Sequence, residues 1–227
     1  MGQGETDLWF YEREALARGR KLVAGIDEAG RGPLAGPVVA AAVILPFGCD
    51  IEGINDSKQL TQQGRETAFE KIVRLALGIG VGVVDEAEID RINILRATYR
   101  AMRGAVGGLT VRPDFVLVDG YPIKDFDYPQ LGIIDGDCKS ASIAAASIVA
   151  KVTRDRIMCI YDQFYPEYGF ARHKGYYTEE HIEKLAVHGV CDIHRKSFEP
   201  VAEEMYLLWP RTELPWVRGG KRGRSSI

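Results

Sequence analysis

The stretch Gly25-Ile-Asp-Glu-Ala-Gly-Arg-Gly-Pro-Leu-Ala-Gly-Pro37 decides how this chain begins to fold, because it joins two apolar runs. Lys21 to Ile26 before it has the pattern of a short strand, and Val38 to Leu45 after it has the pattern of a second strand. Asp27 and Glu28 therefore stand at a strand end, directly before a glycine-rich loop that carries one arginine. At such a place both side chains and backbone can face a ligand.

The adjacent carboxylates of Asp27 and Glu28 repel each other unless a positive charge lies between them. A hard divalent cation suits this pair, since Mg²⁺ takes oxygen ligands and keeps water molecules for a phosphate. The glycines that follow let backbone N–H groups approach the same ligand closely. The pattern favours metal-assisted phosphate chemistry, and the competing interpretation is a solvated Asp-Glu turn.

Two nucleotide-binding loops can be tested against this glycine spacing. A Walker loop ends in Gly-Lys-Ser/Thr, whereas Gly36 is followed by Pro37. A dinucleotide fingerprint needs G-x-G-x-x-G, and Gly30, Gly32 and Gly36 miss that spacing by one residue. The sequence therefore excludes both loops.

Length and composition describe one ordinary soluble globular protein. The 227 residues can bury one sizeable core, and 46% are hydrophobic and 27% charged. No apolar run is long enough for a membrane span, and the N-terminus lacks the pattern of a secretory signal. The four cysteines form no C-x-x-C pair, which argues against a zinc site and for reduced thiols. The sequence predicts a cytoplasmic protein.

The formal net charge of −3 is unusual for a protein that binds phosphate backbones, which select for Lys and Arg. The basic residues are clustered, however, and the segment from Trp216 onward holds four of them without an acid. Acidic excess at an active site would also be offset by bound cations. The charge balance alone therefore decides nothing.

Periodicity and turn signals predict a mixed sheet flanked by helices, an α/β fold. Beyond the first two strands, we expect strands at Gly78 to Val84, Asp114 to Asp119 and Gly132 to Ile134. The expected helices are Gln62 to Leu77, Glu86 to Val106 in one or two pieces, Lys139 to Phe164, Thr178 to Val187 and Pro200 to Leu208.

Two further acids stand at the boundaries of these elements. Asp119 ends a strand before Gly120, where an Asp-Gly turn is the alternative, and Asp137 precedes the long helix, where a helix cap is the alternative. The carboxyl ends of parallel strands meet at one edge of a sheet, where ligands bind. Together with Asp27 and Glu28, they could hold two divalent metals roughly 3.5–4 Å apart, the arrangement used for in-line phosphoryl displacement.

Two neighbouring acids are interpreted as structural. Asp135 begins an Asp-Gly dipeptide, which is typical of a turn. Asp155 follows Lys151 by four residues on the long helix, a spacing that suits an ion pair.

Six motifs, in this order, give the chain its resemblance to a known family. They are Gly25–Pro37 (GIDEAGRGPLAGP), Asn55–Leu60 (NDSKQL), Phe115–Gly120 (FVLVDG), Gly136–Ser140 with Ala144–Asp155 (AAASIVAKVTRD), His173–Tyr176 (HKGY) and His194–Pro200 (HRKSFEP). The chain resembles type 2 ribonuclease H, the bacterial ribonuclease HII, from about Val23 to Pro200.

The resemblance implies an RNase H-like fold with a small C-terminal helical extension. It implies a helical or partly ordered lead-in over residues 1–20, a catalytic domain over 21–190, and a helical extension with a basic tail over 191–227. The implied activity is hydrolysis of the RNA strand of RNA/DNA hybrids, and cutting 5′ of single ribonucleotides in duplex DNA, leaving 3′-OH and 5′-phosphate ends. Mg²⁺ or Mn²⁺ is the implied cofactor; no membrane association follows, and a monomer is the default.

The family's metal-site acids fall on Asp27, Glu28, Asp119 and Asp137, and its Gly-Arg-Gly loop falls on Gly30, Arg31 and Gly32. The resemblance implies that backbone groups of this loop meet the ribose 2′-OH, the group that separates RNA from DNA. It implies that Tyr176 stacks on the sugar after the ribonucleotide, although Tyr177 is beside it, and that Lys58 lies near a substrate phosphate. Two roles are open for three further basic residues, contact with the nucleic-acid backbone or a solvated surface charge: Lys174, Arg195 and Lys196. At Asp135 this chain differs from the family, whose members often carry a basic residue at that position.

Three alternative functions compete with that of a ribonuclease HII. A ribonuclease HIII-like hybrid nuclease shares the acids but usually has a long N-terminal extension, whereas only 26 residues precede Asp27 here. A non-catalytic hybrid-binding module would keep the fold and bind without turnover. A cofactor-dependent α/β reductase is weakened by the glycine spacing.

Overall fold

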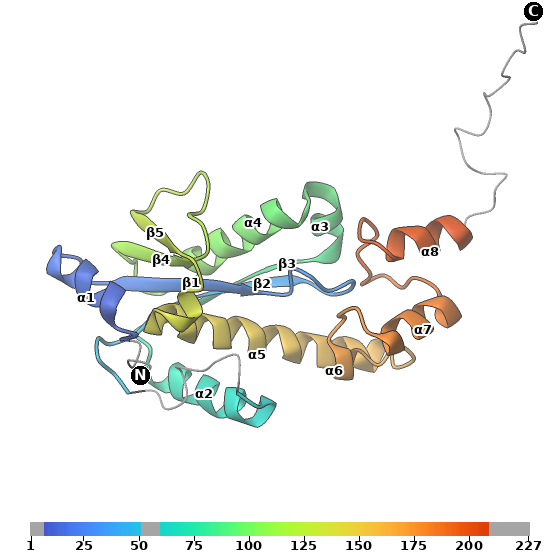
Figure 1. The fold of residues 1–227 in the computed structure, drawn as a ribbon, viewed down its shortest axis with the longest axis horizontal. Helices are drawn as coiled ribbons and strands as arrows, with labels where there is room; N and C mark the ends of the chain where they lie inside the picture. Colours follow the sequence, from blue (N-terminus) through green and yellow to red (C-terminus); the bar gives the residue numbers. More distant parts are fainter. Residues whose placement is uncertain (1–6, 51–59, 209–227) are drawn as a thin grey trace, which may run out of the picture.

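The computed structural model describes residues 7–50 and 60–208, which form a five-stranded mixed sheet covered by helices on both faces (Figure 1). The strands lie in the order β3-β2-β1-β4-β5. Their bounds are Val23–Ala29 (β1), Val38–Ile44 (β2), Gly78–Val84 (β3), Phe115–Asp119 (β4) and Gln130–Ile133 (β5). The expected α/β architecture is confirmed.

Strand β1 is central and pairs in opposite senses on its two sides. It is antiparallel to β2, with Asp27 opposite Ala41, and parallel to β4, with Ile26 opposite Val118. Strand β3 is antiparallel to β2, and β5 is parallel to β4. Strands β1, β4 and β3 therefore all end at the same edge of the sheet.

Two long helices cover the opposite faces of this sheet. Helix α5 (Ala141–Phe164) packs against β1 and β2 on one face, and α4 (Ile94–Gly107) packs against β3 and β2 on the other (Figure 1). The approach of α5 requires glycine in β1, because a Cβ at Gly25 would lie 2.1 Å from the backbone carbon of Ser142. Alanines and β-branched residues fill the space between α5 and the sheet.

Six further α-helices lie within the described ranges, and three of them begin at a side-chain cap, which Thr61, Asp85 and Thr178 provide. They are α1 (Phe10–Ala17), α2 (Gln62–Leu75), α3 (Glu86–Ile92), α6 (Phe170–His173), α7 (Glu179–His188) and α8 (Val201–Leu208), with one 3₁₀ turn, η2 (Gly136–Cys138). No helix within the described ranges is long and apolar enough to cross a membrane.

The boundaries differ from those expected for local reasons. Helix α5 begins at Ala141 rather than Lys139, because the Ser140 side chain accepts a hydrogen bond from the Ile143 amide and caps it. The segment expected as one or two helices is divided at Asn93, whose φ of 70° interrupts the helix. Helix α6 was missed, since its four residues are too few for a periodic pattern. The division of the chain at residues 20 and 190 stays a prediction.

Candidate active site

The four predicted acids lie at the ends of β1 and β4 and in the turn that leads into α5. Asp27 and Glu28 belong to the last three residues of β1, Asp119 is the last residue of β4, and Asp137 is the middle residue of η2. The parallel register of β1 and β4 makes Asp27 and Asp119 the next residues along two neighbouring strands.

Backbone amides hold two of these carboxylates in place. Asp27 Oδ1 accepts from the Glu28 amide at 2.7 Å, and Asp119 Oδ1 accepts from the Gly136 amide at 2.7 Å. The second bond ties the end of β4 to η2, so it brings Asp137, the residue after Gly136, to the same edge. Asp137 is 3% exposed. The residue that caps α5 is Ser140 and not Asp137, which argues against the alternative of a helix cap.

Two of the carboxylates have a raised pKa. Burial is the main cause that raises the pKa of Asp27 well above its ordinary value, and repulsion from Glu28 and Asp119 adds to it. Burial also raises the pKa of Glu28, although Arg31 Nη1, 3.0 Å from Glu28 Oε1, opposes the shift. Negative charge is thus concentrated here beyond what the neighbouring side chains neutralise.

These residues fit a divalent metal by chemistry. They offer carboxylate oxygens, the ligands of Mg²⁺ and Mn²⁺, and a cation would relieve the repulsion that raises the pKa of Asp27. Within the part of the chain that the structure describes, no three acidic, His or Cys side chains are already arranged to hold a metal. The Glu28 side chain forms an ion pair with Arg31, so a cation at this place would compete with that guanidinium for the carboxylate.

Arg195, which is fully buried, fixes the loop that follows these acids. Its guanidinium donates to three loop carbonyls: Nη2 to Gly30 at 2.5 Å, Nη1 to Arg31 at 2.9 Å and Nε to Gly36 at 2.9 Å. The planar fork of arginine suits several acceptors at fixed positions. Both roles expected for Arg195, contact with the nucleic-acid backbone and a solvated charge, are therefore wrong.

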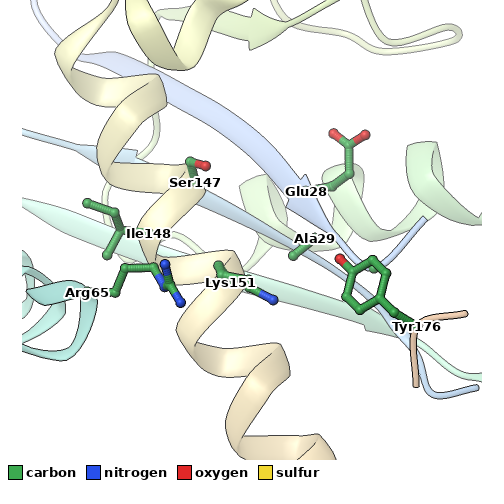
Figure 2. A pocket seen from close by; sticks show the side chains of 8 residues that line it. Glu28, Ala29, Arg65, Ser147, Ile148, Lys151 and Tyr176 are labelled. Carbon is green, nitrogen blue, oxygen red and sulfur yellow. The ribbon is translucent and has the colours of Figure 1, made fainter. Parts of the chain in front are cut away.

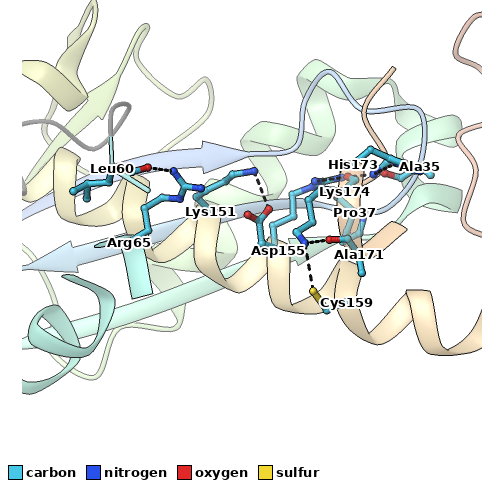
Figure 3. A network of polar contacts seen from close by, with 12 residues as sticks. Ala35, Pro37, Leu60, Arg65, Lys151, Asp155, Cys159, Ala171, His173 and Lys174 are labelled. Carbon is cyan, nitrogen blue, oxygen red and sulfur yellow. Dashed lines mark hydrogen bonds and ion pairs between the residues drawn. The ribbon is translucent and has the colours of Figure 1, made fainter. Parts of the chain in front are cut away.

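Arg154 of α5, also fully buried, holds the far end of the loop, where Figure 3 labels Ala35 and Pro37. Its Nε donates to the Pro37 carbonyl at 2.9 Å, its Nη2 to Ala35 at 3.0 Å and its Nη1 to Lys174 at 2.9 Å. Two arginines thus turn five carbonyls between residues 30 and 37 toward the interior of the protein. The amides of Leu34 and Gly36 are bonded as well, to the carbonyls of Gly175 and Ile193, so the protein itself fixes the backbone of this loop.

A cavity of about 360 Å³ opens beside Glu28 and the start of the loop (Figure 2). It is lined by Glu28, Ala29, Gly30, Arg65, Ser147, Ile148, Lys151 and Tyr176. Ser147 hydrogen-bonds the Asp27 side chain, so one wall of the cavity touches the acid cluster. The predicted pair of Lys151 with Asp155 is confirmed at 2.8 Å. The cavity combines a carboxylate, two cations, a hydroxyl and one aromatic ring.

Tyr176 is the tyrosine that faces this cavity. Its ring lies 5.4 Å from Lys151 Nζ, and it is 39% exposed, whereas Tyr177 is 66% exposed and is not among the lining residues. The Tyr176 carbonyl contacts Nδ1 of the buried His181 at 2.9 Å, and His181 Nε2 lies 3.1 Å from His194 Nε2. Burial lowers the pKa of both rings to about 4, so the histidine that contacts Tyr176 and the one behind it are neutral near pH 7.

Sequence reasoning missed two residues of the cavity wall. Arg65 and Ser147 carry no recognisable signal on their own, since each is a single polar residue in a helix. Lys174, 9% exposed, bonds the Ala171 carbonyl and approaches Cys159, so it is not a solvated charge either (Figure 3). Lys58 lies outside the described residues.

Comparisons with known proteins match the chain along most of its length. The family model described as Ribonuclease HII matches residues 24–201. "Ribonuclease HII" of Acetivibrio thermocellus is 59% identical over 192 residues, covering 85% of this chain and 75% of that protein. "Ribonuclease HII" of Geobacter metallireducens is 56% identical over 202 residues, covering 89% of this chain and 95% of that protein.

Solved structures share the fold. Ribonuclease H2 from Pyrococcus horikoshii is similar with a TM-score of 0.69 and 30% identity, over 82% of this chain and 98% of that one. RNase HIII crystallised with Mn²⁺ is similar with a TM-score of 0.61 over 82% of this chain and 70% of that one; its 18% identity supports the fold alone.

Proposed function

Because this chain belongs to the ribonuclease HII family, a family of divalent-metal-dependent endoribonucleases that act on RNA/DNA hybrids, we propose that it also cuts 5′ of single ribonucleotides embedded in duplex DNA, leaving 3′-OH and 5′-phosphate ends. The observation that carries this finer proposal is the fixed backbone of Gly30–Gly32 directly beside the acid cluster. A nuclease that must find one ribonucleotide needs a rigid reader of the 2′-OH at the point of cleavage.

We assign the metal ligands to Asp27, Glu28, Asp119 and Asp137. These four residues would hold one or two divalent ions, which would supply an activated water and positive charge next to the phosphodiester. The hydroxyl of Ser147 and the amides of Glu28 and Gly136 orient these carboxylates.

Recognition of the ribonucleotide is assigned to the backbone of Gly30, Arg31 and Gly32. The carbonyls of Gly30 and Arg31 accept hydrogen bonds from Arg195, so this part of the backbone is fixed without help from substrate. A rigid backbone site costs little ordering entropy on binding and rejects a deoxyribose, which would leave the reading groups unpaired.

Tyr176 and the cationic wall of the cavity complete the proposed site. The tyrosine ring offers a flat apolar face for the sugar after the ribonucleotide, and Lys151 beside it offers a charge to the phosphate backbone. RNA/DNA hybrid and ribonucleotide-containing duplex DNA are thus the proposed partners, with Mg²⁺ or Mn²⁺ as cofactor and the monomer as the working unit.

The test is cleavage of an end-labelled DNA duplex with one ribonucleotide, in Mg²⁺, Mn²⁺ or EDTA. The proposal predicts a single metal-dependent cut on the 5′ side of the ribonucleotide. Cleavage of a continuous hybrid without a cut at the single ribonucleotide would reject the junction claim and favour a ribonuclease HIII-like specificity. Binding without cleavage of either substrate would indicate a non-catalytic hybrid-binding module.

A further inference from the structure

A second concave surface lies on the face of the sheet opposite α5. It encloses about 910 Å³ between α3, α4 and the loop that joins β4 to β5, and we call it the α4 groove. Its lining residues are Glu88, Arg91, Ile92, Asn93, Leu95, Arg96, Tyr99, Arg100, Arg103, Lys124 and Asp125. None of them is needed for the acid site described above.

The α4 groove is strongly basic. Its lining holds five cationic side chains against two acidic ones, in a chain whose formal net charge is −3. Arg96, Arg100 and Arg103 follow one face of α4 at intervals of four and three residues, while Ala97, Ala101 and Ala105 are buried on the sheet side. The positive charge is therefore a continuous stripe along the outer face of one helix.

The acids of the α4 groove neutralise only part of this stripe. The single carboxylate of Glu88 is shared by Arg91, 2.6 Å away, and Arg100. Arg96 and Arg103 form no ion pair with any residue of the described ranges, and Arg103 instead donates to the Lys124 carbonyl at 3.1 Å. Two arginine charges thus remain available to an anionic ligand.

The α4 groove begins close to the acid site. Lys124 follows Asp119 by five residues, so their Cα atoms are at most about 18 Å apart. Since α3 follows β3 after a single residue, the start of α4 is also near the sheet edge at which β1 and β4 end. A duplex rises about 3.4 Å per base pair, so this distance corresponds to roughly five base pairs.

We propose that the α4 groove binds backbone phosphates of the nucleic-acid duplex on one flank of the cleavage site. The inference rests on the proposed function, because the duplex held at the acids is the polyanion that would extend to this surface. Arginines spaced along a helix complement a phosphate backbone, and such contacts position a duplex without reading its sequence. Binding through the α4 groove is expected to depend on salt and on flank length.

The test measures binding by fluorescence anisotropy in EDTA, with hairpin-closed duplexes that carry four or fifteen base pairs on each side of one ribonucleotide. The variant is Arg96→Ala/Arg103→Ala. We expect it to bind the long duplex about tenfold more weakly at 0.1 M salt, with a salt slope reduced by about 2, because each phosphate contact adds about one to that slope. The variant should bind the short duplex in EDTA as the wild type does, and in a separate assay with Mg²⁺ it should cleave that duplex at the wild-type rate.

Two controls distinguish the loss of a contact at the α4 groove from a general loss of positive charge. Arg18→Ala/Arg74→Ala removes the same charge from side chains that are 78% and 75% exposed on α1 and α2, and it should bind the long duplex as the wild type does. Arg96→Lys/Arg103→Lys keeps the charge and should keep the salt slope.

Two results would overturn the proposal: unchanged binding of the long duplex by the Arg96→Ala/Arg103→Ala variant, or an equal loss in the Arg18→Ala/Arg74→Ala control. Either result leaves cleavage by the wild type untouched. Failure of the wild type to cleave any ribonucleotide-containing substrate would instead reject the proposed function.

Discussion

At the scale of single residues, the loop depends on two buried arginines as well as on its glycines. Arg195 and Arg154 are separated by 41 positions in the sequence, yet they hold carbonyls of the same loop. Each leaves the solvent completely, which is costly for a charge unless every donor finds an acceptor. The loop carbonyls supply those acceptors, so loop and arginines stabilise each other.

Replacing Arg195 should therefore loosen the loop. Arg195→Ala leaves three carbonyls without their donor and should lower the free energy of unfolding by about 3 kcal/mol or more. Arg195→Lys cannot reproduce the fork and should reduce discrimination between a ribonucleotide and its 2′-deoxy counterpart at least tenfold. Urea unfolding and competitive cleavage measure the two effects. Lys196→Ala, at an exposed neighbour, should change neither.

The two glycines of Gly-Arg-Gly should respond differently to alanine. Gly30 has a φ of +91°, and a Cβ there would lie 2.0 Å from Arg154 Nε, so Gly30→Ala should destabilise the fold by about 2–5 kcal/mol. A Cβ at Gly32 meets no atom within 4 Å, so Gly32→Ala should leave the melting temperature unchanged. Loss of cleavage by Gly32→Ala would then report contact with substrate. A large drop in its melting temperature would contradict this picture of the loop.

At the scale of elements, the strand ends could be read from the sequence and their connections could not. Asp27 and Asp119 were predicted at the ends of adjoining strands because the apolar runs before them are clear, and their register confirms the placement. The bond from the Gly136 amide to Asp119 depends on the path of the β5–η2 turn, which no periodicity encodes. Burial of Arg195 likewise depends on tertiary packing. The local sequence His-Arg-Lys has the composition of a solvated basic segment and does not indicate it.

Helix α1 is tied to the start of α5 by one buried carboxylate. Glu12 Oε1 accepts from the Ser140 hydroxyl at 2.6 Å, the Ser142 amide at 3.0 Å and the Ser142 hydroxyl at 2.5 Å. Glu12→Ala should lower the free energy of unfolding by about 1–3 kcal/mol, because these donors become buried without an acceptor. Chemical denaturation tests this. Glu14→Ala, at a half-exposed position of the same helix, is the matched control, and an equal effect there would reject the tether.

At the scale of the whole molecule, charge is separated into regions that a net value of −3 conceals. Carboxylates gather at the ends of β1 and β4, guanidiniums lie beneath the loop, and an arginine stripe follows α4. The sequence predicted the acids from motif spacing. The interior arginines and the α4 stripe could be recognised only once the helices were packed, since each is assembled from separate segments.

Glu86 should make stability depend on pH. Burial raises its pKa to about 7, from an ordinary value of 4.5, against the attraction of Arg195 and Arg154. Between these two pH values the folded state keeps a proton that the unfolded chain has lost, so this group's contribution to stability falls as pH rises. The shift corresponds to about 3 kcal/mol. Glu86→Gln removes it, so the variant should gain stability relative to the wild type between pH 5 and pH 8.

Urea unfolding at pH 5 and pH 8 measures this gain. Glu179→Gln, an exposed acid in the first turn of α7, is the control and should show a difference from the wild type that is the same at both pH values. A Glu86→Gln difference that does not change with pH would contradict the assigned pKa.

The central claim is that the carboxylates at the ends of β1 and β4 carry the cleavage, and Asp119→Asn tests it most directly. The change keeps the size of the side chain and an oxygen that can accept from the Gly136 amide, but removes the charge. Asp135→Asn, two residues before Asp137 at a φ of 53° that asparagine tolerates, is the matched control. Cleavage of a duplex with one ribonucleotide should fall at least a thousandfold in Asp119→Asn and stay within a few-fold of wild type in Asp135→Asn. Full activity of a folded Asp119→Asn protein would contradict the account.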